Sequence, residues 1–482
     1  MLFNSIHFLF FLPVVFILYW FVTNQRLRLQ NILLLGSSYF FYACWNWRFM
    51  LLLIFSTILD YFTAIQIARS EKRKFRLFWF WLSISVNLGF LGFFKYYNFF
   101  ANSFSDFLTS VGLHTDMWAL QVILPVGISF YTFHGLSYVI DIYKKKIGPE
   151  KNFIDYALFV CFFPLLVAGP IERATHLLPQ IKSKRVFKRS QAIDGLRQIL
   201  WGFFKKIVIA DGCAVYVASI FGDTSHNLGS TNLLGAVFFA VQIYCDFSGY
   251  SDIALGVAKL FGIDLLRNFA FPYFSRDIAE FWRRWHISLS SWFKDYLYIP
   301  LGGSKVGTAK KIRNVFLIFI VSGFWHGANW TFIFWGMLNA LFILPSIFFE
   351  RNRKNIEIAG QGKIFPSVRE FASILITFAM TVFAWIFFRS ASMSGAFNFI
   401  SRIFSRSLFA EPAVVVQKYF LLYIFGFFLV EWLGRTEQFA ISNLNRKMPL
   451  IARWGLYISL IEIIIASSPI SGVPQQFIYF QF

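Results

Sequence analysis

Long apolar segments separated by short polar ones run through this chain. A bilayer core of ~30 Å needs ~20 apolar residues per helix, and the hydrophobic runs predict ten membrane spans near residues 5–23, 29–46, 49–68, 77–99, 119–141, 192–221, 232–261, 370–388, 419–434 and 452–469. The first run, IHFLFFLPVVFILYWFV, has no basic segment before it and no small-residue cleavage site after it. This pattern indicates an anchoring span rather than a cleaved signal peptide.

Two apolar stretches do not fit simple crossings. Residues 153–170 and 314–349 each lie between basic segments, so each should enter and leave the membrane on the same side. Pro164, Gly169 and Pro170 should break a helix in the first stretch, and glycines flank His326 in the second. Irregular backbone at membrane depth is tolerated where it is buried in protein or lines a wet cavity. We therefore expect broken or re-entrant helices beside a central cavity.

Composition agrees with an all-α, polytopic membrane protein. The 482 residues are 57% hydrophobic and 14% charged, whereas a soluble domain averages roughly 25% charged residues. The cysteines Cys44, Cys161, Cys213 and Cys245 lie in apolar segments without metal-ligand spacing. We expect buried structural thiols, no disulfide framework and no metal site.

The net charge of +21 is distributed unevenly along the loops. Basic residues cluster at 69–76, 144–151 and 182–189, whereas 101–116 and 222–232 contain no Lys or Arg. The positive-inside rule then places the basic loops in the cytoplasm and the N-terminus outside. Anionic lipid headgroups and an anionic cytosolic substrate account for the positive charge, so nucleic-acid binding is not expected.

A stripe of aromatic residues follows the membrane spans in the middle of the chain. Trp282, Trp285, Leu289, Trp292 and Tyr296 recur at spacings of three and four. This spacing predicts one amphipathic helix at the cytoplasmic interface, leaning into the cavity. His286 lies beside the stripe, and Arg283, Arg284 and Lys294 lie on other faces.

His326, within SGFWHGANW at 322–330, is the second histidine in an apolar aromatic setting. A neutral imidazole can take the proton from a hydroxyl that attacks an acyl carbonyl. Burial disfavours the imidazolium cation and so keeps the base form. We therefore interpret His326 as a catalytic base and His286 as a second active-site residue, with a structural core histidine as the alternative for each.

Several other chemistries are excluded by spacing. GGSKVGTAKK at 302–311 fails as a phosphate loop because Thr308 occupies the lysine position. SGYSD at 248–252 is not a nucleophile elbow, since Ile253 stands where the second glycine belongs. Neither H-E-x-x-H nor a dinucleotide-binding glycine motif in a strand–helix context occurs. Nucleotide hydrolysis, zinc chemistry and serine-hydrolase chemistry are therefore disfavoured.

The chain resembles the membrane-bound O-acyltransferase family. The resemblance rests on QIYCDFSGYSDIALGVAKLFGIDLLRNFAFPYFSRDIAEFWRRWHISLSSWFKDYLYIPLGG (242–303), SGFWHGANWTFIFWG (322–336), FFPLLVAGPIER (162–173) and SFYTFHGLSYVIDIYK (129–144). It extends nearly end to end and is most specific in 242–336, within the branch of bacterial alginate, peptidoglycan and polysaccharide O-acetyltransferases. His134 departs from the glutamine expected in that branch.

The resemblance implies one integral-membrane domain, 1–482, with its catalytic core in 242–336. It further implies about ten transmembrane helices with re-entrant and interfacial helices around a funnel, and His326 and His286 as the active-site pair. Acetyl-CoA would be the acyl donor, with no bound cofactor. The acceptor would be an extracytoplasmic polysaccharide, reached through a periplasmic esterase-like (SGNH) partner. The location would be the bacterial inner membrane.

Other polar residues in this region have two readings. Arg283, Arg284 and Lys294 could bind the phosphates of acyl-CoA, and lipid phosphates would serve equally well. Four carboxylates lie inside apolar blocks: Asp60, Asp141, Asp246 and Asp252. We expect these carboxylates to be paired structurally with nearby polar groups. Asp246 could also line the cavity. D-alanyl transfer to teichoic acids is a rival function. A polysaccharide or lipid transporter, in which the histidines relay protons, is a rival from another class.

Overall fold

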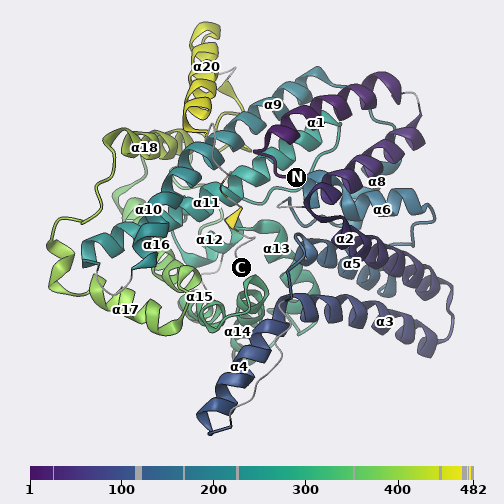
Figure 1. Ribbon diagram of the computed structural model, residues 1–482, viewed down its shortest axis with the longest axis horizontal. Helices are drawn as coiled ribbons and strands as arrows, with labels where there is room; N and C mark the ends of the chain where they lie inside the picture. The colour runs from purple at the N-terminus through teal and green to yellow at the C-terminus, as the bar shows by residue number, and fades with distance from the viewer. Residues whose placement is uncertain are drawn as a thin grey trace. The chain divides into compact units, whose positions relative to one another are not determined.

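The computed structural model describes residues 1–24, 26–113, 122–166, 169–223, 227–350, 353–444, 448–468, 475 and 477–478. Every regular element among these residues is helical (Figure 1), which confirms the all-α prediction. The chain forms two compact units, one of residues 1–192 with 257–266, the other of 193–256 with 267–482. The predicted single domain, 1–482, stays a prediction.

The first unit contains two long helical segments and several short helices. Its elements are α1 (Ile6–Ile17), η1 (Leu18–Val22), α2 (Leu27–Arg69), α3 (Arg73–Leu91), η2 (Gly92–Tyr96), α4 (Tyr97–Ser110), α5 (Ile128–Tyr143), α6 (Phe153–Cys161), α7 (Phe163–Leu166) and α8 (Ala174–Lys182). The start of the predicted span 119–141 lies outside the described residues. Predicted spans 29–46 and 49–68 both lie in α2, which has non-helical backbone at Asn46. The predicted boundary is therefore a kink within one element.

The predicted break in 153–170 is confirmed. Helix α6 ends at Cys161, Phe162 caps it, and α7 covers only Phe163–Leu166. Pro164 has no N–H to continue the helical ladder, and the preceding N–H, of Phe163, donates to Ser38 Oγ at 3.0 Å. A buried His134 also lies in this unit, where its Nε2 accepts from the Glu172 N–H at 3.1 Å. His134, which stands where glutamine is expected, therefore supplies a side-chain acceptor for a backbone N–H.

The second unit contains both candidate histidines. Its elements are most of α9 (Arg189–Phe203), η3 (Phe204–Ala210), α10 (Asp211–Gly222), most of α11 (Gly229–Leu260), η4 (Pro272–Phe274), α12 (Ile278–Arg284), α13 (Ile287–Phe293), η5 (Lys294–Tyr298), α14 (Thr308–His326), α15 (Trp330–Phe348), α16 (Val368–Arg389), α17 (Met393–Ile403), η6 (Arg406–Phe409), α18 (Lys418–Leu433) and α20 (Leu450–Ser467). The predicted break in 314–349 is confirmed between α14 and α15.

Helices α14 and α15 are in backbone contact at two glycines. A Cβ at Gly323 would lie 2.2 Å from the carbonyl oxygen of Phe332, and one at Gly336 would lie 2.2 Å from that of Phe319. Only glycine permits this approach. The pair therefore forms a rigid hairpin with His326 at its turn.

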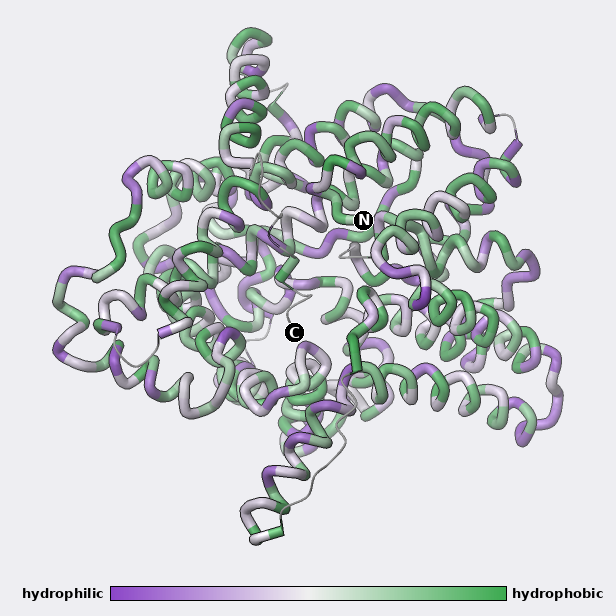
Figure 2. Tube along the Cα trace, viewed as in Figure 1, coloured by the Kyte–Doolittle hydropathy of each residue, from purple (hydrophilic) through white to green (hydrophobic). Residues whose placement is uncertain are grey.

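Six helical segments are long and apolar enough to cross a membrane, among the residues that the structure describes. They are Leu27–Arg69, Arg73–Ser110, Gly229–Leu260, Trp330–Phe348, Val368–Arg389 and Leu450–Ser467, with Ile6–Val22 as a shorter apolar helix. Hydrophobic residues occur along most turns of these helices (Figure 2). The multi-pass architecture is confirmed. Predicted span 192–221 corresponds to the consecutive helices α9, η3 and α10, which are not among these six.

The single amphipathic helix predicted for residues 282–296 is wrong. The stripe is divided among α12, α13 and the π-helical η5, with a break at Trp285 and His286. Trp285 is 1% exposed and Trp292 is 8% exposed. These tryptophans bury their apolar area against the protein interior, so their helical spacing was a core signal rather than an interfacial one.

Candidate active site

His326 is the last residue of α14, at the point where the chain turns into α15. The next residue, Gly327, is extended, with φ −161° and ψ 151°. Asn329 begins the following helix, because its side chain accepts from the Thr331 N–H at 3.1 Å. The His326 ring packs at 5.3 Å from Trp335 and 5.4 Å from Phe388, between ring centroids. The local sequence thus places one buried imidazole at a helix end within an aromatic wall.

His286 has a left-handed backbone, with φ 43° and ψ 54°, between α12 and α13. This conformation is uncommon for a residue other than glycine and persists only where its surroundings impose it. Asn268 supplies two of the constraints: its carbonyl accepts from the Ile287 N–H at 2.9 Å, and its side-chain Oδ1 accepts from Ser288 Oγ at 2.6 Å. A third bond runs from the Ala270 N–H to the Arg284 carbonyl at 2.9 Å. Segment 268–270 therefore clamps the chain on both sides of His286.

The two histidines face one cavity. Their ring centroids lie 6.5 Å apart, with the planes at 57°. The cavity has a volume of about 130 Å³ and is lined by Trp282, His286, Leu289, Ser290, Phe293, Ile318, Phe319, Ser322 and His326. The structure therefore brings together the two residues that the sequence singled out 40 positions apart.

Two hydroxyls that the sequence pattern did not single out also line this cavity. Ser322 lies four residues before His326 on α14, and Ser290 lies four residues after His286. Residues at i and i+4 share a helix face, so the spacing from each histidine was the available signal. Both serines can donate or accept hydrogen bonds beside a reacting group.

Burial sets the protonation state of His286. The side chain is 2% exposed, and burial lowers its pKa from 6.5 to about 3. His286 lies outside the six candidate spans, and its ring packs edge-on against Phe247 at 4.7 Å between centroids. The imidazole is therefore neutral near pH 7. A pKa so far below the working pH makes His286 a weak proton acceptor and suits a hydrogen-bonding or orienting role.

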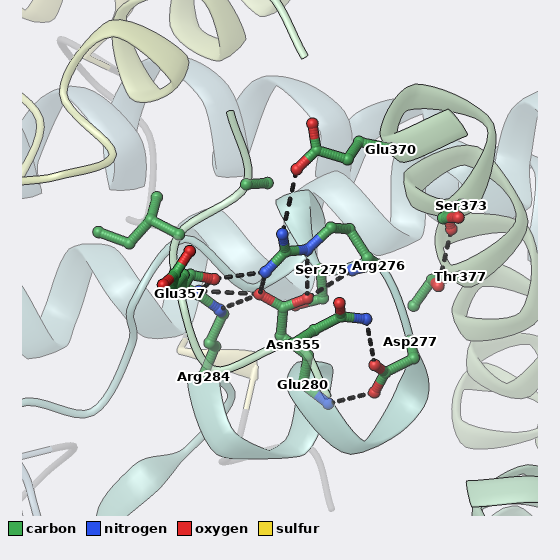
Figure 3. Close-up of polar contacts among 12 residues, drawn as sticks. Ser275, Arg276, Asp277, Glu280, Arg284, Asn355, Glu357, Glu370, Ser373 and Thr377 are labelled. Carbon is green, nitrogen blue, oxygen red and sulfur yellow. Dashed lines mark hydrogen bonds and ion pairs between the residues drawn. The ribbon is translucent and has the colours of Figure 1, made fainter. Parts of the chain in front are cut away.

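Arg284 belongs to a charged network on α12 (Figure 3). Its Nε and one terminal nitrogen donate to Glu280 at 3.1 and 2.8 Å. Arg276 donates to the same carboxylate through its Nε at 3.1 Å and pairs with Glu370 at 3.1 Å. Because Glu280 is 1% exposed, these arginines neutralise a buried charge.

The other predicted phosphate ligands are more accessible. Arg283 has an exposed side chain and donates to the Asn355 carbonyl at 2.8 Å. Lys294 is 61% exposed and lies 3.7 Å from Asp295. Neither residue lines the histidine cavity. The acyl-CoA role of Arg283, Arg284 and Lys294 stays a prediction, and Arg284 already has a structural partner.

Asp246 and Asp252, the two candidate carboxylates of the second unit, form ion pairs. Lys206 lies 2.8 Å from Asp246 and 2.7 Å from Asp211, while Lys205 lies 2.5 Å from Asp252. Asp246 also accepts from the Ile478 N–H at 2.7 Å. Asp246 does not line the histidine cavity. The structural pairing predicted for Asp246 and Asp252 is therefore observed, and the expectation that Asp246 lines the cavity is wrong.

Asp60 and Asp141, the two candidate carboxylates of the first unit, also have structural partners. Asp60 accepts from Ser83 and Asn87 at 2.7 Å each, and Asp141 pairs with Lys146 at 3.1 Å. In the described part of the chain, no group of three or more His, Cys, Asp or Glu side chains could hold a metal ion.

Comparison with known proteins identifies the family. The sequence model of MBOAT, the membrane-bound O-acyltransferase family, matches residues 147–391, which include both histidines. The chain belongs to the membrane-bound O-acyltransferase family. It is 39% identical over 407 residues to a probable alginate O-acetylase of Pseudomonas aeruginosa, covering 84% of this chain and 75% of that protein.

Two further relatives differ from the first in their named activities. A peptidoglycan O-acetyltransferase of Helicobacter pylori is 35% identical over 426 residues, covering 82% of this chain and 78% of that protein. A teichoic acid D-alanyltransferase of Bacillus subtilis is 28% identical over 276 residues, covering 55% of this chain and 68% of that protein. The chain is therefore an acyltransferase, and its similarity to the O-acetyltransferases covers more of its length.

Proposed function

We propose that this membrane O-acyltransferase moves acetyl groups from cytosolic acetyl-CoA to an extracytoplasmic polysaccharide. The observation that carries the proposal is the single cavity of about 130 Å³ shared by His286 and His326. A cavity needs roughly 10–15 Å³ of such volume to hold one water molecule, so this cavity has room for an acetyl group. The similarity to alginate and peptidoglycan O-acetyltransferases supports the same acyl group.

In the proposed reaction His326 acts as the general base. It takes the proton from an acceptor hydroxyl while the hydroxyl oxygen bonds to the acetyl carbonyl carbon. The carbon–sulfur bond then breaks, and the imidazolium returns the proton to the departing thiolate. The products are the O-acetyl ester and free coenzyme A. The neutral His286 ring, held by Asn268, would orient the carbonyl or the acceptor hydroxyl.

The direction of transfer follows from the loop charges. Basic loops at 69–76, 144–151 and 182–189 favour a cytoplasmic donor side, and an external N-terminus follows from the same rule. We further propose the bacterial inner membrane as the location and a periplasmic esterase-like protein as the immediate acceptor. Such a relay would leave selection of the polysaccharide to that partner.

The experiment uses the purified chain in lipid nanodiscs with acetyl-CoA labelled in the acetyl group. Acetyl-CoA should be consumed with release of free coenzyme A when an esterase-like partner or a polysaccharide acceptor is added. D-alanyl transfer, the rival suggested by the teichoic acid relative, would require a D-alanyl thioester on a carrier protein. If the chain consumes the D-alanyl thioester and no acetyl-CoA, D-alanyl transfer replaces the proposal. If it consumes neither thioester, a transporter is favoured.

A further inference from the structure

A second, strongly apolar groove lies in the second unit, outside the histidine cavity. It has a volume of about 430 Å³, and α16, α18 and α11 supply most of its walls. Phe371, Leu375 and Phe378 line it from α16 at spacings of three and four, and Phe428 and Trp432 line it from α18. No charged side chain is among its described lining residues. The apolar lining of the groove suits an acyl chain rather than a polar substrate.

The segment that leads into α16 has the composition of a membrane interface. Ile364 is 69% exposed, Phe365 is 79% exposed and Val368 is 87% exposed. Lys363 and Arg369 flank this run, and both are exposed. Aromatic and aliphatic residues beside cations are typical of chain that rests at the lipid headgroups. Segment 363–369 is therefore a basic, apolar mouth at the end of the groove where α16 begins.

The depth of the groove fits one leaflet. Helix α16, a candidate membrane span, begins at Val368. The groove residues run from Phe371 to Phe378, a rise of about 10 Å at 1.5 Å per residue, and one leaflet contributes about half of the ~30 Å core. At the mouth, Trp432 of α18 donates its indole N–H to the Ile364 carbonyl at 2.7 Å. This bond fixes the upper end of the groove to segment 363–369.

The other charges near the mouth are already engaged. Glu370 accepts from Arg276 at 3.1 Å and from the Ser367 N–H at 3.0 Å. Arg435 stacks on Trp432 at 3.9 Å and donates to the carbonyls of Ala359 and Gly360 at 2.8 and 2.7 Å. Lys363 and Arg369 have no ion pair among the described residues, so these two cations can meet an anion at the headgroup level.

From this arrangement we propose that the groove binds one anionic phospholipid of the surrounding bilayer. One acyl chain lies against Phe371, Leu375 and Phe378, and the phosphate lies between Lys363 and Arg369. The apolar length selects a lipid over a soluble phosphate, and the two cations select an anionic headgroup over a zwitterionic one. The proposal is independent of the acetyl-transfer reaction.

The test measures lipid bound to the full-length protein in neutral detergent by native mass spectrometry. Dioleoyl phosphatidylglycerol should be retained as one molecule per protein, about tenfold more than dioleoyl phosphatidylcholine at equal concentration. Glycerol 3-phosphate, which has the anionic group and no acyl chain, should not bind. Equal retention of both lipids, or binding of glycerol 3-phosphate alone, would overturn the proposal.

Two pairs of variants locate the site. Leu375→Trp should fill the groove and abolish retention, whereas Ile376→Trp, one position along on an exposed face outside the groove, should behave as wild type. Lys363→Gln with Arg369→Gln should remove the preference for phosphatidylglycerol, and Lys72→Gln with Arg73→Gln is the charge-matched control. Identical retention by Leu375→Trp and Ile376→Trp would place the lipid elsewhere. The wild-type comparison remains decisive if a variant does not fold.

Discussion

The Ser288 hydroxyl donates to Oδ1 of Asn268 at 2.6 Å, and both side chains are 1% exposed. Ser288 lies two residues after His286, whose left-handed backbone is held between hydrogen bonds to segment 268–270. Asn268 is therefore a positioning residue: it is not among the residues that line the histidine cavity, yet it fixes the backbone on which one imidazole is mounted.

Removing this clamp should slow transfer without weakening donor binding. A displacement of about 1 Å at a reacting group costs about 100-fold in rate, so Asn268→Ala should lower kcat by about 10- to 100-fold with little change in KM for the donor. Ser288→Ala should have a smaller effect in the same direction, and Ser288→Thr should restore the rate because it keeps the hydroxyl. Steady-state kinetics on equal amounts of folded protein check this. A rise in KM with unchanged kcat would contradict the positioning role.

Substitution of Arg284 should affect stability, whereas substitution of Arg283 should affect the KM for the acyl donor. Arg284→Gln removes a partner from the buried Glu280 carboxylate, so it should lower the apparent unfolding temperature. Arg283→Gln leaves that ion pair intact and should raise the KM for acyl-CoA if its guanidinium meets the donor phosphates. Thermal unfolding and donor titration on each variant provide the comparison. An unchanged KM in Arg283→Gln would return this residue to the lipid-headgroup role.

Protonation of His286 should destabilise the protein in acid. Its pKa is about 3 in the fold against an ordinary value of 6.5, so the unfolded chain binds the extra proton between these values and stability falls as pH drops below 6.5. The apparent unfolding temperature should therefore decrease from pH 7.5 to 5.0. His286→Asn should lose less over the same range. Equal losses in both proteins would assign the acid sensitivity to other groups.

The loop charges predict a membrane topology that can be tested in intact cells. In a Cys44→Ser background, cysteine at Asn102 should react with an impermeant thiol reagent from outside, whereas cysteine at Lys72 should not. Segment Arg73–Ser110 has 38 residues, about 57 Å of helix, and so exceeds the ~30 Å core and can separate these positions. Labelling of both sites from the outside would contradict the positive-inside assignment.

Local sequence signals predicted the helix breaks well. Gly327 and the helix-capping Asn329 lie within three residues of His326, so the turn that follows this buried imidazole is encoded where it occurs. Pro164 similarly accompanies the break between α6 and α7. In each case the residue that breaks the helix is adjacent to the break.

The conformation of His286 could not be predicted in the same way. Its helix break is imposed by hydrogen bonds that Asn268, 18 positions upstream, accepts from Ile287 and Ser288. The aromatic periodicity across 282–296 continues through the break. The structural role of Arg284 did have a local signal. Arg276, Glu280 and Arg284 follow one another at i+4 spacing, which is the spacing of helix ion pairs.

The role of His326 is tested most directly by acetyl transfer from labelled acetyl-CoA in membranes that hold equal amounts of wild type, His326→Ala and His286→Ala. We expect His326→Ala to lose at least about 100-fold of the rate while keeping wild-type accumulation and detergent stability. His286→Ala should retain measurable turnover. Wild-type transfer by His326→Ala would contradict the general-base assignment, and a His326→Ala protein that fails to accumulate would favour a structural histidine.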